Sequence, residues 1–127
     1  MITAAWWAVG ITAFILFARL SLGPVRWARH VLGRRRQAEL RAEALLLGWL
    51  SPGQRAQYRA RGWFEVVTPG GSRYRICPGK VVRLDVRRCA YCIEAVSWMP
   101  AADQMLAKKL LLETDERRFL ATAHRYC

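Results

Sequence analysis

Acidic residues are scarce in this sequence. It has 9 Asp and Glu against 21 Lys and Arg, which gives a formal net charge of +12 over 127 residues. A chain with this charge and few apolar residues would be disordered, but 54% of the residues here are hydrophobic. The composition therefore excludes a disordered polyelectrolyte, and the length allows one domain core with a short additional segment.

Motifs typical of enzymes are also lacking. The sequence has no glycine-rich phosphate loop, no nucleophile elbow and no pair of carboxylates at metal-binding spacing. Neither His30 nor His124 has a nucleophile and an acid arranged recognisably around it. The acids Glu113, Asp115 and Glu116 lie where a helix is predicted to begin, so they favour the helix dipole rather than acid–base catalysis. We expect a protein that is not an enzyme and that needs no cofactor.

Charge is absent from residues 2–18, ITAAWWAVGITAFILFA. As a helix this run is about 26 Å long, and continuing past Arg19 to Leu22 extends it to roughly 32 Å, against a hydrocarbon layer of ~30 Å. A cleaved signal peptide is one alternative, although no basic residue precedes the run; a buried core helix is another. The sequence predicts a transmembrane anchor over residues 1–23. Its anchoring aromatic side chains are Trp6, Trp7, Phe14, Phe17 and Trp27.

Arginines follow the apolar run, and the positive-inside tendency places that side in the cytoplasm. This predicts an inner-membrane protein with its N-terminus outside and its C-terminal domain in the cytoplasm. Gly23 and Pro24 are expected to break the helix, and residues 24–50 then form a basic amphipathic helical linker. The lipid bilayer and its anionic headgroups are expected partners. The arginines that follow the run are Arg19, Arg26, Arg29, Arg34, Arg35 and Arg36.

Residues 51–127 have the pattern of a small α+β domain. Ser51 is a predicted N-cap, and Gly62 is predicted to end the helix that follows. Short aromatic and β-branched segments then predict three or four antiparallel strands, at 63–67, 72–77, 81–85 and 90–96. Two helices follow. They are expected to begin at Pro100 and Thr114 and to direct Met105, Leu106, Leu110, Phe119, Leu120 and Ala123 to the core. The fold class is therefore α+β, with a transmembrane helix, a basic helical linker and a small sheet closed by C-terminal helices.

Two lysines and several arginines are expected on the solvent side of this domain. In the first C-terminal helix, Lys108 and Lys109 are predicted to face water. In SRYRIC, the alternation directs Arg73 and Arg75 to one sheet face and Tyr74 to the other. Arg83, Arg87 and Arg88 are predicted to line the same basic face, with Tyr74 or Tyr91 near enough to stack on bases if exposed. The predicted contacts with an anionic partner, a nucleic acid or an anionic lipid, are Arg26, Arg29, Arg34, Arg35, Arg36, Arg73 and Arg75.

The four cysteines are expected to be reduced, because structural disulfides are rare in the cytoplasm. Cys89 and Cys92 form a C-x2-C pair, which with Cys77 and with Cys127 or His124 supplies the ligands of a zinc site. A redox dithiol is a weaker alternative, since no βαβ pattern surrounds the pair. We expect ordinary thiols and no bound metal, with zinc as the alternative that elemental analysis would test.

Residues from about Leu50 to Tyr126 resemble a small domain that recurs in hypothetical bacterial and phage proteins. The segments that carry the resemblance are ARGWFEV, RYRI, VVRLD and DQMLAKKLLLETDERRFLATA. Most of these residues are core and turn positions, so the resemblance implies a shared fold rather than a shared site. Together with the predicted anchor, these features indicate an accessory or adaptor subunit of a larger membrane assembly, with a protein partner in the membrane. The alternative is a membrane-tethered binding module for an anionic partner.

Overall fold

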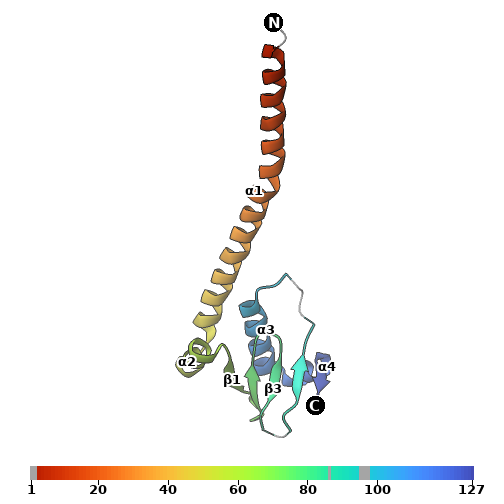
Figure 1. Cartoon of the computed structure of the whole chain (residues 1–127). Helices are drawn as coiled ribbons and strands as arrows, with labels where there is room; N and C mark the ends of the chain where they lie inside the picture. The colour runs from red at the N-terminus through yellow and green to blue at the C-terminus, as the bar shows by residue number, and fades with distance from the viewer. Residues whose placement is uncertain (1–2, 86, 95–97) are drawn as a thin grey trace. The chain divides into compact units, whose positions relative to one another are not determined.

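The computed structural model describes residues 3–85, 87–94 and 98–127 (Figure 1). It divides into two compact units, Met1–Gln37 and Ala38–Cys127. The long helix α1 (Thr3–Trp49) supplies all the described structure of the first unit and the beginning of the second. In α1, side chains are described at positions 11, 14–17 and 25 and from 27 onward. Trp6, Trp7, Arg19 and Arg26 therefore lie in the helix, but their side chains are outside the described part.

The predicted transmembrane anchor is wrong. Among the residues that the structure describes, no helix is long and apolar enough to cross a membrane. The charge-free run of residues 2–18 is shorter as a helix, at about 26 Å, than a hydrocarbon layer of ~30 Å, and the prediction depended on extending it past the charge of Arg19. The predicted inner-membrane localisation, with the N-terminus outside and the domain in the cytoplasm, depended on the same span and is corrected with it.

The predicted break at Gly23 and Pro24 is also absent, because α1 is continuous from Thr3 to Trp49. Inside a helix a proline removes one backbone hydrogen bond and disfavours the helix, although its fixed φ of about −65° lies in the helical range. The second compact unit begins at Ala38, within the segment predicted as a linker. Ala42, Leu46 and Leu50 are buried in its core.

The helix α2 (Pro52–Arg61) has the predicted boundaries. The Ser51 hydroxyl accepts a hydrogen bond from the Gln54 backbone N–H, and the Gln54 side chain accepts one from the Ser51 N–H, at 3.3 and 3.1 Å. This capping box satisfies two backbone donors at the start of the helix. Gly62 ends the helix in the left-handed region, at φ 75°, which a residue without a side chain adopts at little cost.

An antiparallel five-stranded sheet follows, with its strands in sequence order. The first four strands lie within the predicted segments, although the fourth ends at Cys92, and residues 95 and 96 of the predicted segment 90–96 lie outside the described residues. The fifth pairs with the fourth and is not among the predicted strands. Its three side chains are all exposed, so no alternation of apolar and polar residues marks it in the sequence. The strands are β1 (Phe64–Val67), β2 (Arg73–Ile76), β3 (Val81–Arg83), β4 (Ala90–Cys92) and β5 (His124–Tyr126).

One face of this sheet carries the core of the second unit. The register aligns Phe64, Ile76, Val81 and Tyr91 in a row across four strands, and all four are buried. The helices α3 (Ala101–Thr114) and α4 (Glu116–Thr122) cover this face. Their fully or nearly fully buried apolar side chains are Ala102, Met105, Leu106, Leu112 and Phe119. The helices therefore close one side of the sheet, as the sequence predicts.

Candidate functional site

The open face of the sheet carries Arg73 and Arg75, as the alternation predicts. Both arginines pair with Glu65 on the neighbouring strand, with N–O distances of 3.0 and 3.1 Å. Burial raises the pKa of Glu65, but the hydrogen bonds from Arg75 and Arg73 prevail and hold it below its usual value. The Arg75 guanidinium also lies 4.0 Å from the centre of the Trp63 ring. Part of the positive charge of this face is therefore neutralised within the protein.

The other arginines predicted for this face lie elsewhere. Arg83 is paired in register with Tyr74, so its side chain belongs to the opposite side of the sheet. There its Nε donates to the Asp85 carboxylate at 2.8 Å. Arg87 and Arg88 are exposed in the connection between β3 and β4. The structure thus brings Arg73 and Arg75 together and separates Arg83 from them.

The tyrosines proposed to stack on nucleic-acid bases are both in the core. Tyr74 has no exposed surface, and Tyr91 is also buried. Their rings pack against Phe119, at centroid distances of 6.1 and 6.0 Å. Because a stacking platform needs an exposed ring, this part of the nucleic-acid prediction is wrong.

A polar network that the sequence did not indicate joins β2 to α4. The Tyr74 hydroxyl donates to Glu116 Oε1 at 2.6 Å, and the Thr68 hydroxyl donates to Glu116 Oε2 at 2.8 Å. Burial raises the pKa of Glu116, but the hydrogen bonds from Tyr74 and Thr68 outweigh it and the pKa falls below its usual value. The neighbouring acids also have structural roles, since Asp115 caps α4 and Glu113 pairs with Lys109.

Glu116 should make stability depend on pH. Its pKa is lower in the folded chain than the ~4.3 of an unfolded chain. The ionised Glu116 therefore contributes fully to the free energy of unfolding above about pH 4.3, and this contribution is lost as the pH falls through the pKa of the folded chain. We expect Glu116→Gln to lower the free energy of unfolding by about 1.5–3 kcal/mol at pH 7, because it weakens hydrogen bonds to a charged group. The loss should shrink near pH 3. Urea unfolding at both pH values measures it.

Two variants control this measurement. Tyr74→Phe removes one donor to the Glu116 carboxylate, so its loss and that of Glu116→Gln should be less than additive when combined. Glu94→Gln changes an exposed carboxyl group outside the network and should have little effect. Equal losses for Glu116→Gln at pH 7 and pH 3 would contradict the proposed role of the ionised carboxylate.

The cysteines differ from the expectation that all four are reduced. Cys89 and Cys127 form a disulfide, whereas Cys77 and Cys92 are free. The bond joins residues 38 positions apart in sequence, brought together by the pairing of β4 with β5. It uses two of the sulfurs of the alternative zinc site. Within the described ranges, no group of three or more His, Cys, Asp and Glu residues is placed to hold a metal ion.

Large apolar side chains are exposed along α1. Phe14 is 73% exposed and Phe17 71%, and both positions between them are also more than half exposed. Successive residues of a helix are about 100° apart, so the four consecutive positions 14–17 cover its whole circumference. Further along, Arg29, Arg34, Arg35 and Arg36 are exposed. In the first unit, α1 therefore has an apolar segment followed by a cationic segment, and most of the side chains described there are exposed.

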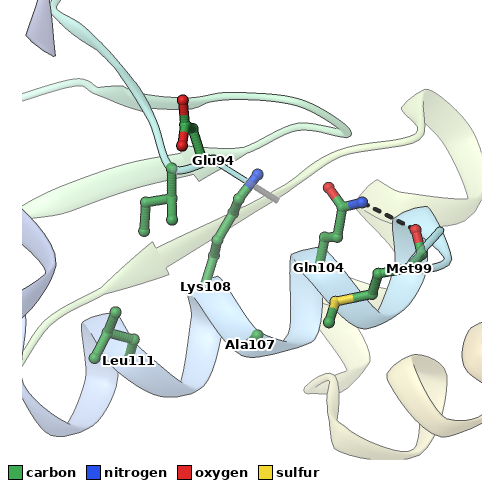
Figure 2. A pocket seen from close by; sticks show the side chains of 7 residues that line it. Glu94, Met99, Gln104, Ala107, Lys108 and Leu111 are labelled. Atoms are coloured by element: carbon green, nitrogen blue, oxygen red, sulfur yellow. Dashed lines mark hydrogen bonds between the residues drawn. The ribbon is translucent and has the colours of Figure 1, made fainter. Parts of the chain in front are cut away.

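A small pocket lies between α3 and the segment that follows β4 (Figure 2). It has a volume of about 220 Å³ and a mainly apolar lining. Its main polar feature is Lys108, which with Lys109 was predicted to face water. Instead the two lysines are 4% and 6% exposed. The residues that line the pocket are Ile93, Glu94, Met99, Gln104, Ala107, Lys108 and Leu111.

Part of this burial was visible in the sequence. Lys109 follows Met105 by four residues and Leu106 by three, which places it on the core face of the helix. Its charge is matched by Glu113, one turn further on. Lys108 follows Met105 by three residues and precedes Leu112 by four, so the same spacing places it towards the core. Beside it, Ile93 and Glu94 line the pocket.

Comparisons of the sequence with protein-family models and curated proteins, and of the structure with solved structures, gave no match.

Proposed function

We propose that this protein is a non-enzymatic accessory subunit that joins a protein assembly through residues 11–36 of α1. The observation that carries the proposal is the exposure of apolar side chains on every side of the helix at positions 14–17. A helix that is apolar all round is normally buried among other elements. An exposed apolar surface of this kind is typical of a protein-interaction site.

The distribution of the apolar residues indicates the geometry of the partner. A single partner helix covers only one stripe along another helix. The apolar side chains at positions 14–17, in contrast, are distributed around the whole circumference of α1. We therefore infer that at least two helices of the partner pack around this segment. Ile11, Val25, Trp27 and Leu32 extend the exposed apolar surface along α1.

The arginines indicate the charge of the partner. Arg29, Arg34, Arg35 and Arg36 are exposed, and none forms an ion pair within the described part of the chain. Side by side in a parallel dimer of this protein, they would repel one another. A different protein with acidic side chains opposite residues 29–36 would instead attract them. The proposed partner is thus a helical protein, apolar opposite residues 11–27 and acidic opposite the arginines.

Site-specific photocrosslinking tests this proposal in cells. Position 14 is compared with position 98, because Phe14 and Trp98 are similarly exposed, at 73% and 77%, in different units. A photoreactive phenylalanine at position 14 should give a discrete protein adduct that is missing from position 98. The same adducts from both positions, or nucleic-acid adducts at position 14, would contradict the proposal.

With the partner identified, we expect Phe14→Ala and Phe17→Ala each to weaken binding by about tenfold or more. Full burial of such a side chain contributes roughly 1.5–3 kcal/mol, and 1.4 kcal/mol corresponds to a tenfold change in Kd. Replacing Arg34, Arg35 and Arg36 together by alanine should slow association and reduce its dependence on salt. Trp98→Ala is the matched control. Titration calorimetry and stopped-flow kinetics measure these effects, and unchanged affinity of the Phe14→Ala variant would contradict this interface.

A further inference from the structure

The side chain of Lys108 is buried without a polar partner. It is 4% exposed, and its ammonium nitrogen has no hydrogen-bond partner within the described part of the structure. Lys109, the next residue, is buried to a similar degree but pairs with Glu113. A buried amine without a partner is costly, and such groups are uncommon in proteins, so each one calls for an explanation.

The pocket beside this amine has the character of a ligand site. Its lining is mostly apolar, from residues such as Ile93, Met99 and Leu111, with a few polar groups, as in sites for small organic molecules. Its volume of about 220 Å³ is below the ~300–1,000 Å³ of sites for drug-sized ligands. A ligand that fits is therefore small. Figure 2 shows the Lys108 side chain extending from α3 between Glu94 and Gln104.

We propose that this pocket binds a small, mainly apolar aldehyde or ketone, which Lys108 Nζ holds as a Schiff base. The site goes beyond the proposed assembly function, because it lies in the second unit and uses none of the exposed residues of α1. It requires a nucleophilic amine, a cavity for the carbonyl compound and a group that transfers protons. Lys108, the apolar lining and Glu94 supply these three requirements.

The amine is suited to the reaction. Burial lowers the pKa of Lys108, an effect that Cys92 and Cys77 oppose in part. More of the side chain is then the neutral amine, which is the nucleophile in Schiff-base formation. Glu94 lines the pocket and is exposed, and its negative charge disfavours an anionic ligand. A neutral carbonyl compound therefore fits better than a carboxylate.

The chemical step needs no other reactant. The lone pair of Lys108 Nζ forms a bond to the carbonyl carbon, and the carbonyl oxygen takes up a proton to give a carbinolamine. The nitrogen loses its first proton as the carbinolamine forms and its second as the hydroxyl group takes up another proton and leaves as water, so that a C=N bond replaces the C=O bond. One water is released and nothing is oxidised or reduced. Among the residues that line the pocket, Glu94 is the one with a carboxyl group, and we assign the proton transfer to it because carboxyl groups are common general acid–bases in proteins.

Reductive trapping on the full chain tests the proposal, with benzaldehyde as the probe and cyanoborohydride as the reductant. The chain has internal controls, because its lysines are Lys80, Lys108 and Lys109. Lys80 is exposed, and Lys109 is buried but paired. At pH 7 we expect Lys108 to be modified severalfold faster than either, as measured by peptide mass spectrometry, because burial lowers its pKa and the pocket holds the aldehyde beside its amine. Modification of Lys108 no faster than Lys80 would overturn the proposal.

Further variants and probes separate this site from general reactivity. Lys108→Met, which keeps an unbranched apolar side chain, should fold and leave only the slow background at other amines. Glu94→Gln should slow trapping at Lys108 severalfold and leave the thermal midpoint unchanged. A pyrene aldehyde, too large for the pocket, should not react at Lys108. Equal reaction of the large aldehyde at Lys108 would overturn the proposal. Stabilisation of the protein by benzoate, without any benzaldehyde adduct at Lys108, would also overturn it and would indicate an anion site instead.

Discussion

Replacing Phe119 by alanine is expected to lower the free energy of unfolding by about 3–5 kcal/mol. Phe119 has no exposed surface, and its ring is the meeting point of α4 with the sheet. It packs edge-on against Tyr74 and tilted against Tyr91, at centroid distances of 6.1 and 6.0 Å. Aromatic pairs of this kind contribute about 0.5–1.5 kcal/mol beyond the burial of apolar area. The loss is a large fraction of the ~5–15 kcal/mol that stabilises a typical domain.

Urea unfolding followed by circular dichroism measures this effect. Phe119→Leu keeps a large apolar side chain, so it should lose much less than Phe119→Ala. Arg118→Ala is a neighbouring control, because Arg118 lies in the same helix and its side chain is exposed. If Phe119→Ala destabilised the protein no more than Arg118→Ala did, the ring would not hold α4 on the sheet.

Loss of the disulfide between Cys89 and Cys127 is expected to cost roughly 2–4 kcal/mol. The bond closes a loop across a sequence separation of 38 residues, which restricts the unfolded chain. It also holds β5 beside β4, where Tyr91 pairs with Arg125 and Cys92 with His124. All three side chains of β5 are exposed, so burial contributes little to that pairing. Without the bond, the amide hydrogens of β5 should exchange rapidly with solvent.

Cys127→Ser is the cleaner variant, because Cys127 is exposed whereas Cys89 is 2% exposed. A reductant added to the unmodified protein should lower its urea midpoint by the same amount and have little further effect on Cys127→Ser. The variants Cys77→Ser and Cys92→Ser control for the loss of a thiol, since both residues are free. An unmodified protein whose stability and β5 exchange ignore reductant would contradict the structural role of the bond.

The tertiary structure does not favour the sheet as the surface that contacts an anionic partner. Its arginines are engaged with Glu65, and its tyrosines are in the core. The arginines of α1 have no such internal partners within the described residues. We therefore assign the cationic contacts of the proposed assembly to α1. The salt dependence of association, compared between the unmodified protein and the variant without Arg34, Arg35 and Arg36, tests this assignment.

Local sequence patterns determined the elements of the second unit. Ser51 and Gly62 mark the ends of α2, because a hydroxyl cap and a left-handed glycine satisfy the backbone at those positions. The alternation of Arg73, Tyr74 and Arg75 gave the two faces of β2 correctly, since successive strand residues point to opposite sides. The core position of Phe119 also follows from the apolar stripe of a helix. Each of these signals lies within a few residues of the structure that it predicts.

Long-range contacts decided the features that sequence reasoning missed. The fifth strand and the disulfide depend on the return of His124–Tyr126 to β4, which no short pattern encodes. The side on which Arg83 lies depends on its register with Tyr74. The predicted transmembrane helix was wrong for a different reason, because no described helix is long and apolar enough to cross a membrane. Local conformation follows from neighbouring residues, whereas strand partners and bonded cysteines are chosen by the packing of segments far apart in the chain.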